Sequence, residues 1–183
     1  MGYHKGQCWD RYCFFYINTL IEVVEGSNLY LFADDNKLFN VIINENDSFL
    51  LQSNIDNMYN WTVDSLLVFH PDKCFAMNIR QKSLEQCQHR YSMNNKPLEL
   101  KSDIKDLGVL VDEHLCFTKH ISEKVNKANQ IMGLIRRTLT YLDKHNFNLL
   151  FKSLVRPHIE YANTVWSPHL KSDINLIESV QRR

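Results

Sequence analysis

The sequence predicts an α+β fold in which strands and hairpins come first and helices follow. Two observations lead to this prediction. Up to about residue 113, apolar runs of strand length alternate with turn-forming residues, whereas from residue 114 apolar residues recur at helical spacing. The charge changes at the same place, since residues 1–113 carry 10 Lys and Arg against 16 Asp and Glu, and residues 114–183 carry 11 against 5. We therefore expect two domains, 1–113 and 114–183.

The clearest hairpin pattern lies at residues 29–43. Two apolar, β-prone runs, 29–33 and 38–43, flank Asp34-Asp35-Asn36, whose residue types favour a turn. A hairpin there would place two carboxylates at its tip, where a bound divalent cation would relieve their repulsion. A polar turn without any ligand is the alternative.

Helices are predicted on either side of this hairpin in the chain. Apolar residues at helical spacing predict one over 14–24, ended by Gly26-Ser27, and a second capped by Asn46 or Asp47. Further strands are predicted at 66–69, 74–79, 91–93, 98–100 and 107–111, with turns at 70–73 and 94–97. Gly108 lies inside the last of these runs, which indicates either close approach of another group or a β-bulge.

The second part reads as helical throughout. An amphipathic helix is expected after Thr118, because its apolar residues step by four, three, four and three: Ile121, Val125, Ala128, Met132 and Ile135. Asp143 is placed to cap a helix that buries Phe147, Leu150, Phe151 and Leu154. Pro157 should kink or restart this helix. A last helix is expected from about Asp173, with Ile174, Ile177 and Val180 on its apolar side.

Composition narrows the class of protein. The chain has 183 residues, of which 44% are hydrophobic and 23% charged, as is usual for a globular domain. No run approaches the ~18 uninterrupted apolar residues of a membrane span, and the first residues do not resemble a signal peptide. Five cysteines, odd in number and irregularly spaced, fit a reducing compartment. We expect a cytoplasmic or nuclear location and no secretion.

The tetrapeptide Phe32-Ala33-Asp34-Asp35 resembles the Tyr/Phe-x-Asp-Asp signature of reverse transcriptases, in the form common among LINE-type, jockey-like non-LTR retrotransposons. Segments similar to other blocks of that family occur in the family's order along nearly the whole chain. They lie at residues 15–20, 61–77, 107–112, 155–166 and 177–183. Agreement of several ordered blocks is much harder to reach by chance than one short motif.

The resemblance implies a partial polymerase palm over 1–113, built of β-hairpins with packed helices, and an all-helical thumb-like region over 114–183. The intact family enzyme is an RNA-directed DNA polymerase, a nucleotidyltransferase that adds dNTPs to a DNA primer by two-metal phosphoryl transfer. The implied partners are an RNA template, a DNA primer and a dNTP, without a membrane.

The same resemblance assigns roles to individual residues. Asp34 and Asp35 would be catalytic ligands of Mg²⁺ or Mn²⁺, and Lys73 would protonate the departing pyrophosphate. Ala33 would lie beside the primer terminus and Gly108 at the primer grip. Phosphate contacts are expected from basic residues of the helical part: Lys124, Lys127, Arg136, Arg137 and Lys152. From residue type alone, Lys73 could be an exposed turn lysine without a role, and the other basic residues could simply solvate helix faces.

The sequence also departs from the family pattern. The first catalytic carboxylate block, of the type Asp-Phe-x-Lys-Ala-Phe-Asp, does not occur before Asp34, and no segment resembles the fingers. The glycine-bearing substrate loop is degraded at Lys5–Tyr12. We therefore expect a truncated polymerase that binds metal weakly or not at all and is inactive alone. The alternatives are a catalytically dead nucleic-acid-binding remnant and a structural helical-hairpin protein unrelated to polymerases.

Overall fold

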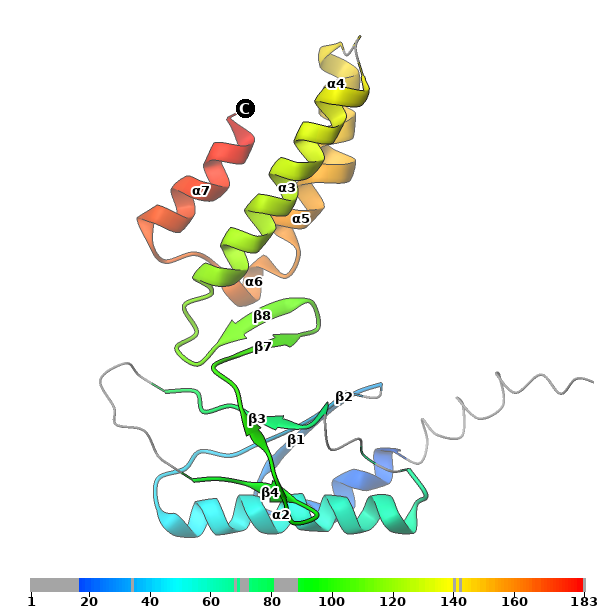
Figure 1. Cartoon of the computed structure of the whole chain (residues 1–183), viewed down its shortest axis with the longest axis vertical. Helices are drawn as coiled ribbons and strands as arrows, with labels where there is room; N and C mark the ends of the chain where they lie inside the picture. The colour runs from blue at the N-terminus through cyan, green and yellow to red at the C-terminus, as the bar shows by residue number, and fades with distance from the viewer. Residues whose placement is uncertain are drawn as a thin grey trace, which may run out of the picture. The chain divides into compact units, whose positions relative to one another are not determined.

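The computed structural model describes residues 17–33, 35–67, 69, 73–80, 89–139, 141 and 143–182 (Figure 1). Helices and small sheets are mixed, so the α+β prediction is confirmed. The described residues form two compact units. The hairpin unit runs to Ala76 and includes 89–100, and the helical unit includes 77–80 and the described residues from Lys101 onwards.

The units divide at residue 100 and not at the predicted position 113. The reason is the antiparallel hairpin of β7 (Asp103–Asp106) and β8 (Val109–Asp112). Its residue Val109 is buried in the same apolar core as Ile121 of the following helix. A hairpin that buries its side chains among helices belongs to the helical unit, whatever its own secondary structure.

The hairpin unit begins with a 3₁₀-helix, η1 (Asn18–Val23), followed by strands β1 (Asn28–Phe32) and β2 (Asp35–Phe39). The two strands are antiparallel, with Phe32 opposite Asp35. The predicted hairpin is present, but its second strand starts three residues before the predicted position. The connection is short because Ala33 adopts a φ of 52°, the left-handed conformation that tight hairpin turns require.

Helix α2 (Glu45–Asp64) carries the core of this unit. Its cap is Asn44, which accepts a hydrogen bond from the Asp47 N–H at 3.0 Å, and the Asp47 carboxylate accepts from the Asn44 N–H in return. The sequence predicted Asn46 or Asp47 as the cap. Both residues instead lie in the first turn of the helix. Ile55 is buried as expected, packed with Leu38 of β2.

Two amide side chains of α2 hold neighbouring segments by paired hydrogen bonds. Asn54 accepts from the Glu25 N–H at 3.0 Å and donates to the Glu25 carbonyl at 2.7 Å. Gln52 does the same with Ser92, at 2.9 and 2.8 Å. Each pair satisfies both backbone groups of the residue it holds, which makes these polar side chains compatible with burial, nearly complete for Asn54.

The remaining strands of this unit are short. β3 (Phe75–Ala76) runs parallel to β6 (Glu99–Leu100), and β4 (Ser92–Met93) pairs with β5 (Lys96–Pro97) across the turn Asn94-Asn95. The predicted strand at 66–69 is wrong for the residues described there. Leu66 has a φ of 57° and the Leu67 N–H bonds back to the Thr62 carbonyl, so the chain is still turning after α2. The predicted strand at 74–79 is reduced to β3.

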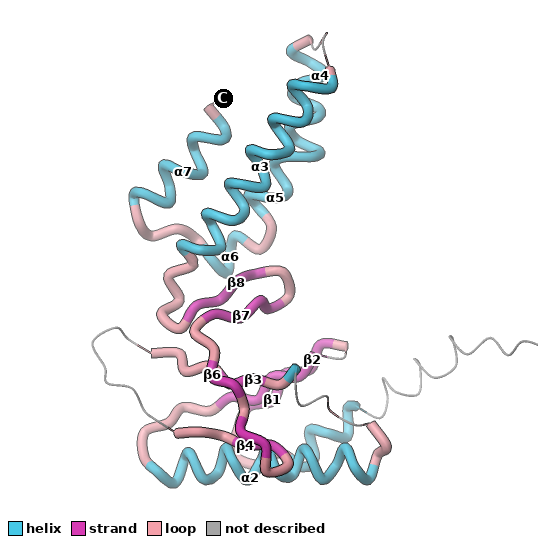
Figure 2. The backbone as a smooth tube through the Cα atoms, in the orientation of Figure 1, coloured by secondary structure: helices cyan, strands magenta, loops and turns pink. Residues whose placement is uncertain are grey.

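The helical unit contains α3 (Thr118–Thr138), α4 (Lys144–Leu150), the π-helix η3 (Phe151–Val155), α5 (Arg156–Glu160), α6 (Asn163–Trp166) and α7 (Lys171–Gln181). Figure 2 draws the helical segments in cyan. The amphipathic prediction for α3 is confirmed, because all five of its predicted apolar residues are buried. None of the helices that the structure describes is long and apolar enough to cross a membrane.

Outcomes differ for the later helices. Asp143 caps α4 as predicted, accepting from the Asn146 N–H at 2.8 Å. Leu154 is 46% exposed and is not a core residue. Pro157 restarts the helix as α5, and since it cannot donate an N–H, the preceding turn is widened to η3. Asp173 lies within α7, buried, and accepts from the Thr118 hydroxyl at 3.1 Å.

Candidate functional site

The tip of the β1–β2 hairpin is the predicted catalytic site. Asp34 lies outside the described residues. Asp35 is exposed as the first residue of β2, and Ala33 is exposed beside it in the turn. Across the described ranges, no three His, Cys, Asp or Glu side chains gather in a way that could hold a metal ion.

One face of the same hairpin is aromatic and open to solvent. The rings of Tyr30 and Phe39 stack across the strands with centroids 5.3 Å apart. Both side chains are exposed, as is Phe32. Leu38 precedes Phe39 in the strand, so its side chain lies on the opposite face of the hairpin, where it packs on the core beside Ile55. The hairpin is thus anchored through one face and presents its tip and its aromatic face outward.

Lys73 is exposed and lies two residues before β3. β3 pairs with β6, in a two-stranded sheet separate from the β1–β2 hairpin. The structure thus places Lys73 in the hairpin unit, before a sheet that does not contain Asp35. Its proposed role in protonating pyrophosphate remains a prediction.

Gly108 does not lie in a strand, contrary to our prediction. With Leu107 it forms the turn between β7 and β8, and both residues have positive φ, 44° and 87°. The close approach that a glycine indicates is present, but the approaching group belongs to the chain itself. A Cβ atom at Gly108 would lie 3.3 Å from Cε1 of Tyr161. Whether a primer also meets this turn stays a prediction.

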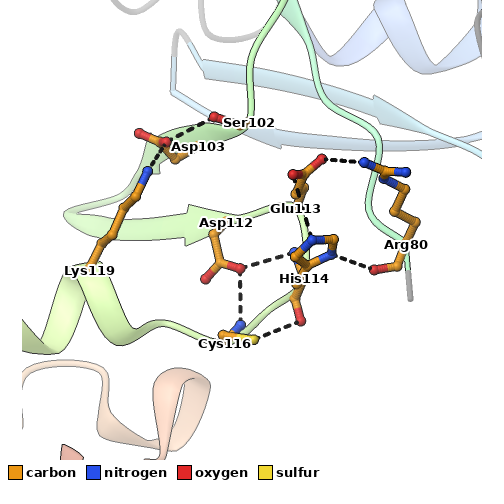
Figure 3. Close-up of polar contacts among 8 residues, drawn as sticks. All are labelled: Arg80, Ser102, Asp103, Asp112, Glu113, His114, Cys116 and Lys119. Atoms are coloured by element: carbon orange, nitrogen blue, oxygen red, sulfur yellow. Dashed lines mark hydrogen bonds and ion pairs between the residues drawn. The ribbon is translucent and has the colours of Figure 1, made fainter. Parts of the chain in front are cut away.

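Sequence reasoning missed the role of Asp112, which orders the loop between β8 and α3 (Figure 3). One carboxylate oxygen accepts from the N–H groups of His114 and Cys116 at 3.0 and 3.1 Å, and the other accepts from Phe117 at 2.6 Å. Partial burial raises the pKa of Asp112, but these N–H groups, with His114 nearby, outweigh it and hold the pKa below its ordinary value. The three hydrogen bonds to the Asp112 carboxylate support a loop in which Leu115 and Phe117 both have positive φ.

Ion pairs flank this loop (Figure 3). Arg80 lies 3.4 Å from the Glu113 carboxylate, and the Arg80 carbonyl is 3.0 Å from Nδ1 of His114. On the other side, Lys119 contacts Asp103 at 2.6 Å. Lys119 and the Ser102 hydroxyl lower the pKa of Asp103. Ion pairs in contact with solvent contribute little to stability, so these pairs position the loop more than they stabilise the fold.

His120 is a buried histidine that links β8, α3 and α6. Its Nδ1 accepts a hydrogen bond from the Leu110 N–H at 3.0 Å, and its ring lies against that of Trp166, with centroids 5.4 Å apart. The other ring nitrogen, Nε2, is buried and has no partner. Burial, and then the charge of Lys124, lower the pKa of His120, opposed by Glu123 on the same helix. The neutral ring is therefore the form that the fold accommodates.

This geometry predicts a loss of stability in mild acid. The pKa of His120 in the folded protein lies below its unfolded value of 6.5. The neutral ring therefore contributes fully to the free energy of unfolding above pH 6.5, and this contribution is lost as the pH falls from 6.5 through the folded pKa. Between pH 7.5 and 5.5, the free energy of unfolding of the helical unit should fall by up to about 1.4 kcal/mol from this group. Urea unfolding at both pH values measures it.

The matched variant is His120→Asn, whose amide oxygen can still accept from Leu110 but does not titrate. Its unfolding free energy should change less between the two pH values than that of the unchanged protein. Equal pH dependence in the two proteins would contradict the assignment of the acid sensitivity to His120.

The predicted phosphate-binding residues do not share one face of α3. Lys124 and Lys127 are neighbours one turn apart, beside the buried stripe. Arg136 and Arg137 lie in the last turn, about 15 Å further along the axis. Lys152 is exposed on η3. The positive charge is thus spread along the helical unit and not concentrated in one patch.

Comparison of the chain with protein-family models, with curated proteins and with solved structures found no match.

Proposed function

We propose that this chain is a segment of an RNA-directed DNA polymerase of a non-LTR retrotransposon, comprising the catalytic hairpin and a thumb-like helical region. One observation carries the proposal. The signature that begins at Phe32 coincides with the end of β1, a tight turn and the first residue of β2, which is Asp35. Helix α2 supports the hairpin from one face through Leu38 and Ile55, leaving the tip accessible.

A hairpin suits this chemistry because the pairing of its strands restricts the backbone on both sides of its turn. Asp34 and Asp35 would bind Mg²⁺ or Mn²⁺, which when bound activates the primer 3′-hydroxyl and stabilises the leaving pyrophosphate. The protein's own contribution is to hold Asp35 at the start of a strand, paired opposite Phe32. A further strand with its own carboxylate would have to complete the site, since the sequence contains no such block before Asp34.

The helical unit supports a role in nucleic-acid binding. Residues 114–183 carry 11 Lys and Arg against 5 Asp and Glu. An excess of positive charge attracts phosphates without reading sequence. The same observation supports our second candidate, a nucleic-acid-binding remnant without catalysis, because it does not depend on the carboxylates.

The test is the salt dependence of binding to an RNA–DNA hybrid by the full chain. Affinity should fall steeply as salt rises, because each phosphate contact releases counterions. Replacing Lys124 and Lys127 with glutamine removes two neighbouring charges, so the slope of log affinity against log salt should become shallower by about 1.8. Fluorescence anisotropy at several salt concentrations measures this slope.

The control is Lys144→Gln with Lys171→Gln. These exposed lysines are the first residues of α4 and α7, where a positive charge does not favour the helix dipole, so their loss should leave the fold intact. An unchanged slope in both double variants, or no binding by the unchanged chain, would mean that the basic residues only solvate the helices.

A further inference from the structure

The middle of strand β8 is attached to helix α3 through His120. In an antiparallel pair, alternate residues direct their backbone N–H groups away from the partner strand. Leu110, which is paired with Lys105 of β7, is such a residue, because its N–H donates to Nδ1 of His120 at 3.0 Å. The imidazole ring thus takes the place beside β8 that a third strand would take in a larger sheet.

This hydrogen bond requires a neutral ring. A backbone N–H can only donate, so Nδ1 of His120 carries a lone pair and the ring proton lies on Nε2. Nε2 is buried and has no partner among the described residues. A protonated ring would therefore present one N–H to the Leu110 donor and the other to no acceptor, and both losses are costly in a buried position. The neighbouring Trp166 side chain attracts a cation but has no hydrogen-bond acceptor.

The charged groups around His120 do not remove this conflict. On its own helix, Lys124 and Glu123 act on the ring in opposite directions. Asp112 of β8 accepts from N–H groups of the following loop, and Asp173 of α7 accepts from a hydroxyl at the start of α3. Helix α6 contains no titratable residue. The other charged or titratable groups of α5, α7 and the start of α3 are exposed or partly exposed: Lys119, Arg156, His158, Glu160, Lys171 and Glu178.

The two ends of the β7–β8 hairpin are held by contacts that mild acid does not remove. At its turn, the Tyr161 hydroxyl donates a hydrogen bond to the Leu107 carbonyl at 2.8 Å. At the other end, Asp103 pairs with Lys119, and Asp112 holds the loop before α3. Hydrogen bonds from Lys119 lower the pKa of Asp103, and for Asp112 partial burial is outweighed by the loop N–H groups, so that its pKa is lowered too. Both carboxylates therefore stay charged at pH 5.5.

We propose that His120 is a pH-sensitive switch: its neutral ring holds the middle of β8 on α3, and protonation in mild acid opens this contact while both ends of the hairpin stay attached. On opening, Nδ1 takes up a proton from water and the Leu110 N–H donates to water instead. Burial lowers the pKa of His120, so the closed form is complete above pH 6.5 and weakens as the pH falls below it. This opening is local, unlike unfolding of the helical unit, and does not depend on the proposed polymerase function.

Amide hydrogen exchange of the full chain, followed by NMR at several low urea concentrations, tests the switch. Between pH 7.5 and 5.5, and corrected for the intrinsic pH dependence of exchange, the opening constant of the Leu110 amide should rise by up to about tenfold. It should not depend on urea, because a local opening exposes little surface. If Leu110 instead shows the urea dependence of the most protected amides of α3, the strand leaves only when the whole unit unfolds, and the switch is overturned. An opening constant that is the same at both pH values also overturns it.

His120→Asn should remove the pH dependence of Leu110 opening, because its amide accepts the same hydrogen bond and does not titrate. His145→Asn is the matched control and should keep this dependence, since His145 is an exposed residue of α4. Dependence that survives in His120→Asn would assign the opening to another group and overturn the proposal. Should His120→Asn fail to fold, the unchanged chain decides: nitrogen–proton NMR of its imidazole ring at pH 7.5 should show the proton on Nε2, and a proton on Nδ1 would refute the switch.

Discussion

Replacing Trp166 with alanine is expected to lower the free energy of unfolding of the helical unit by about 3–5 kcal/mol. Trp166 is 2% exposed within the apolar core that joins α3, α7 and the β7–β8 hairpin. Its loss leaves a large cavity beside His120 and removes the hydrogen bond to the Tyr161 carbonyl. Urea unfolding followed by far-ultraviolet circular dichroism measures the change, since this signal does not depend on the tryptophan.

The neighbouring residue provides the control. Val165 lies in the same short helix but is 58% exposed, so Val165→Ala should change the unfolding free energy by less than about 1 kcal/mol. Similar losses of unfolding free energy in the two variants would contradict the conclusion that burial of Trp166 stabilises this core. A loss below about 1 kcal/mol for Trp166→Ala would do the same.

We also expect that the isolated 183-residue chain does not extend a primer. Two-metal phosphoryl transfer needs carboxylates from separate strands to hold both cations, and the sequence supplies only the pair at Asp34 and Asp35 in a suitable block. Losing an essential member of a catalytic unit costs several orders of magnitude in rate. Primer extension on poly-rA/oligo-dT with Mg²⁺ or Mn²⁺ measures it, with Asp34→Ala/Asp35→Ala as background.

The sequence predicted best those elements whose signal is local. The helix α3 is one example. The spacing of its apolar residues from Ile121 to Ile135 is enough to predict which face of the 21-residue helix is buried. The cap at Asp143 is another, and so is the first half of the turn predicted at 94–97, since Asp and Asn favour these positions by themselves.

The predictions were wrong where distant contacts decide the conformation. Leu107 and Gly108 looked like strand residues because Leu-Gly-Val-Leu-Val is apolar, whereas Tyr161, 54 residues away, holds the first two in a turn. The division of the described residues into two units after residue 100 has a related reason. Strand pairing within β7–β8 is local, but the burial of Val109 among helices is not visible in the hairpin's own sequence.

Buried polar residues were missed as well. Asn54 falls on the same face of α2 as Ile55 and Met58, and an amide within an apolar stripe is a signal for a buried hydrogen-bonded clamp. Of the candidate site, the sequence predicted the hairpin that carries Asp35. It could not indicate that Tyr161 occupies the space beside Gly108.

The central claim is that the hairpin bearing Asp34 and Asp35 is the catalytic hairpin of a polymerase. Its most direct test is primer extension by an active non-LTR reverse transcriptase in which residues 28–64 of this chain, from β1 through α2, replace the corresponding segment. We predict extension within about tenfold of the parent enzyme, and a loss of at least about 10³-fold on Asp34→Ala in the hybrid enzyme. A hybrid enzyme that folds and binds primer–template, yet extends no faster than its Asp34→Ala variant, would contradict the claim.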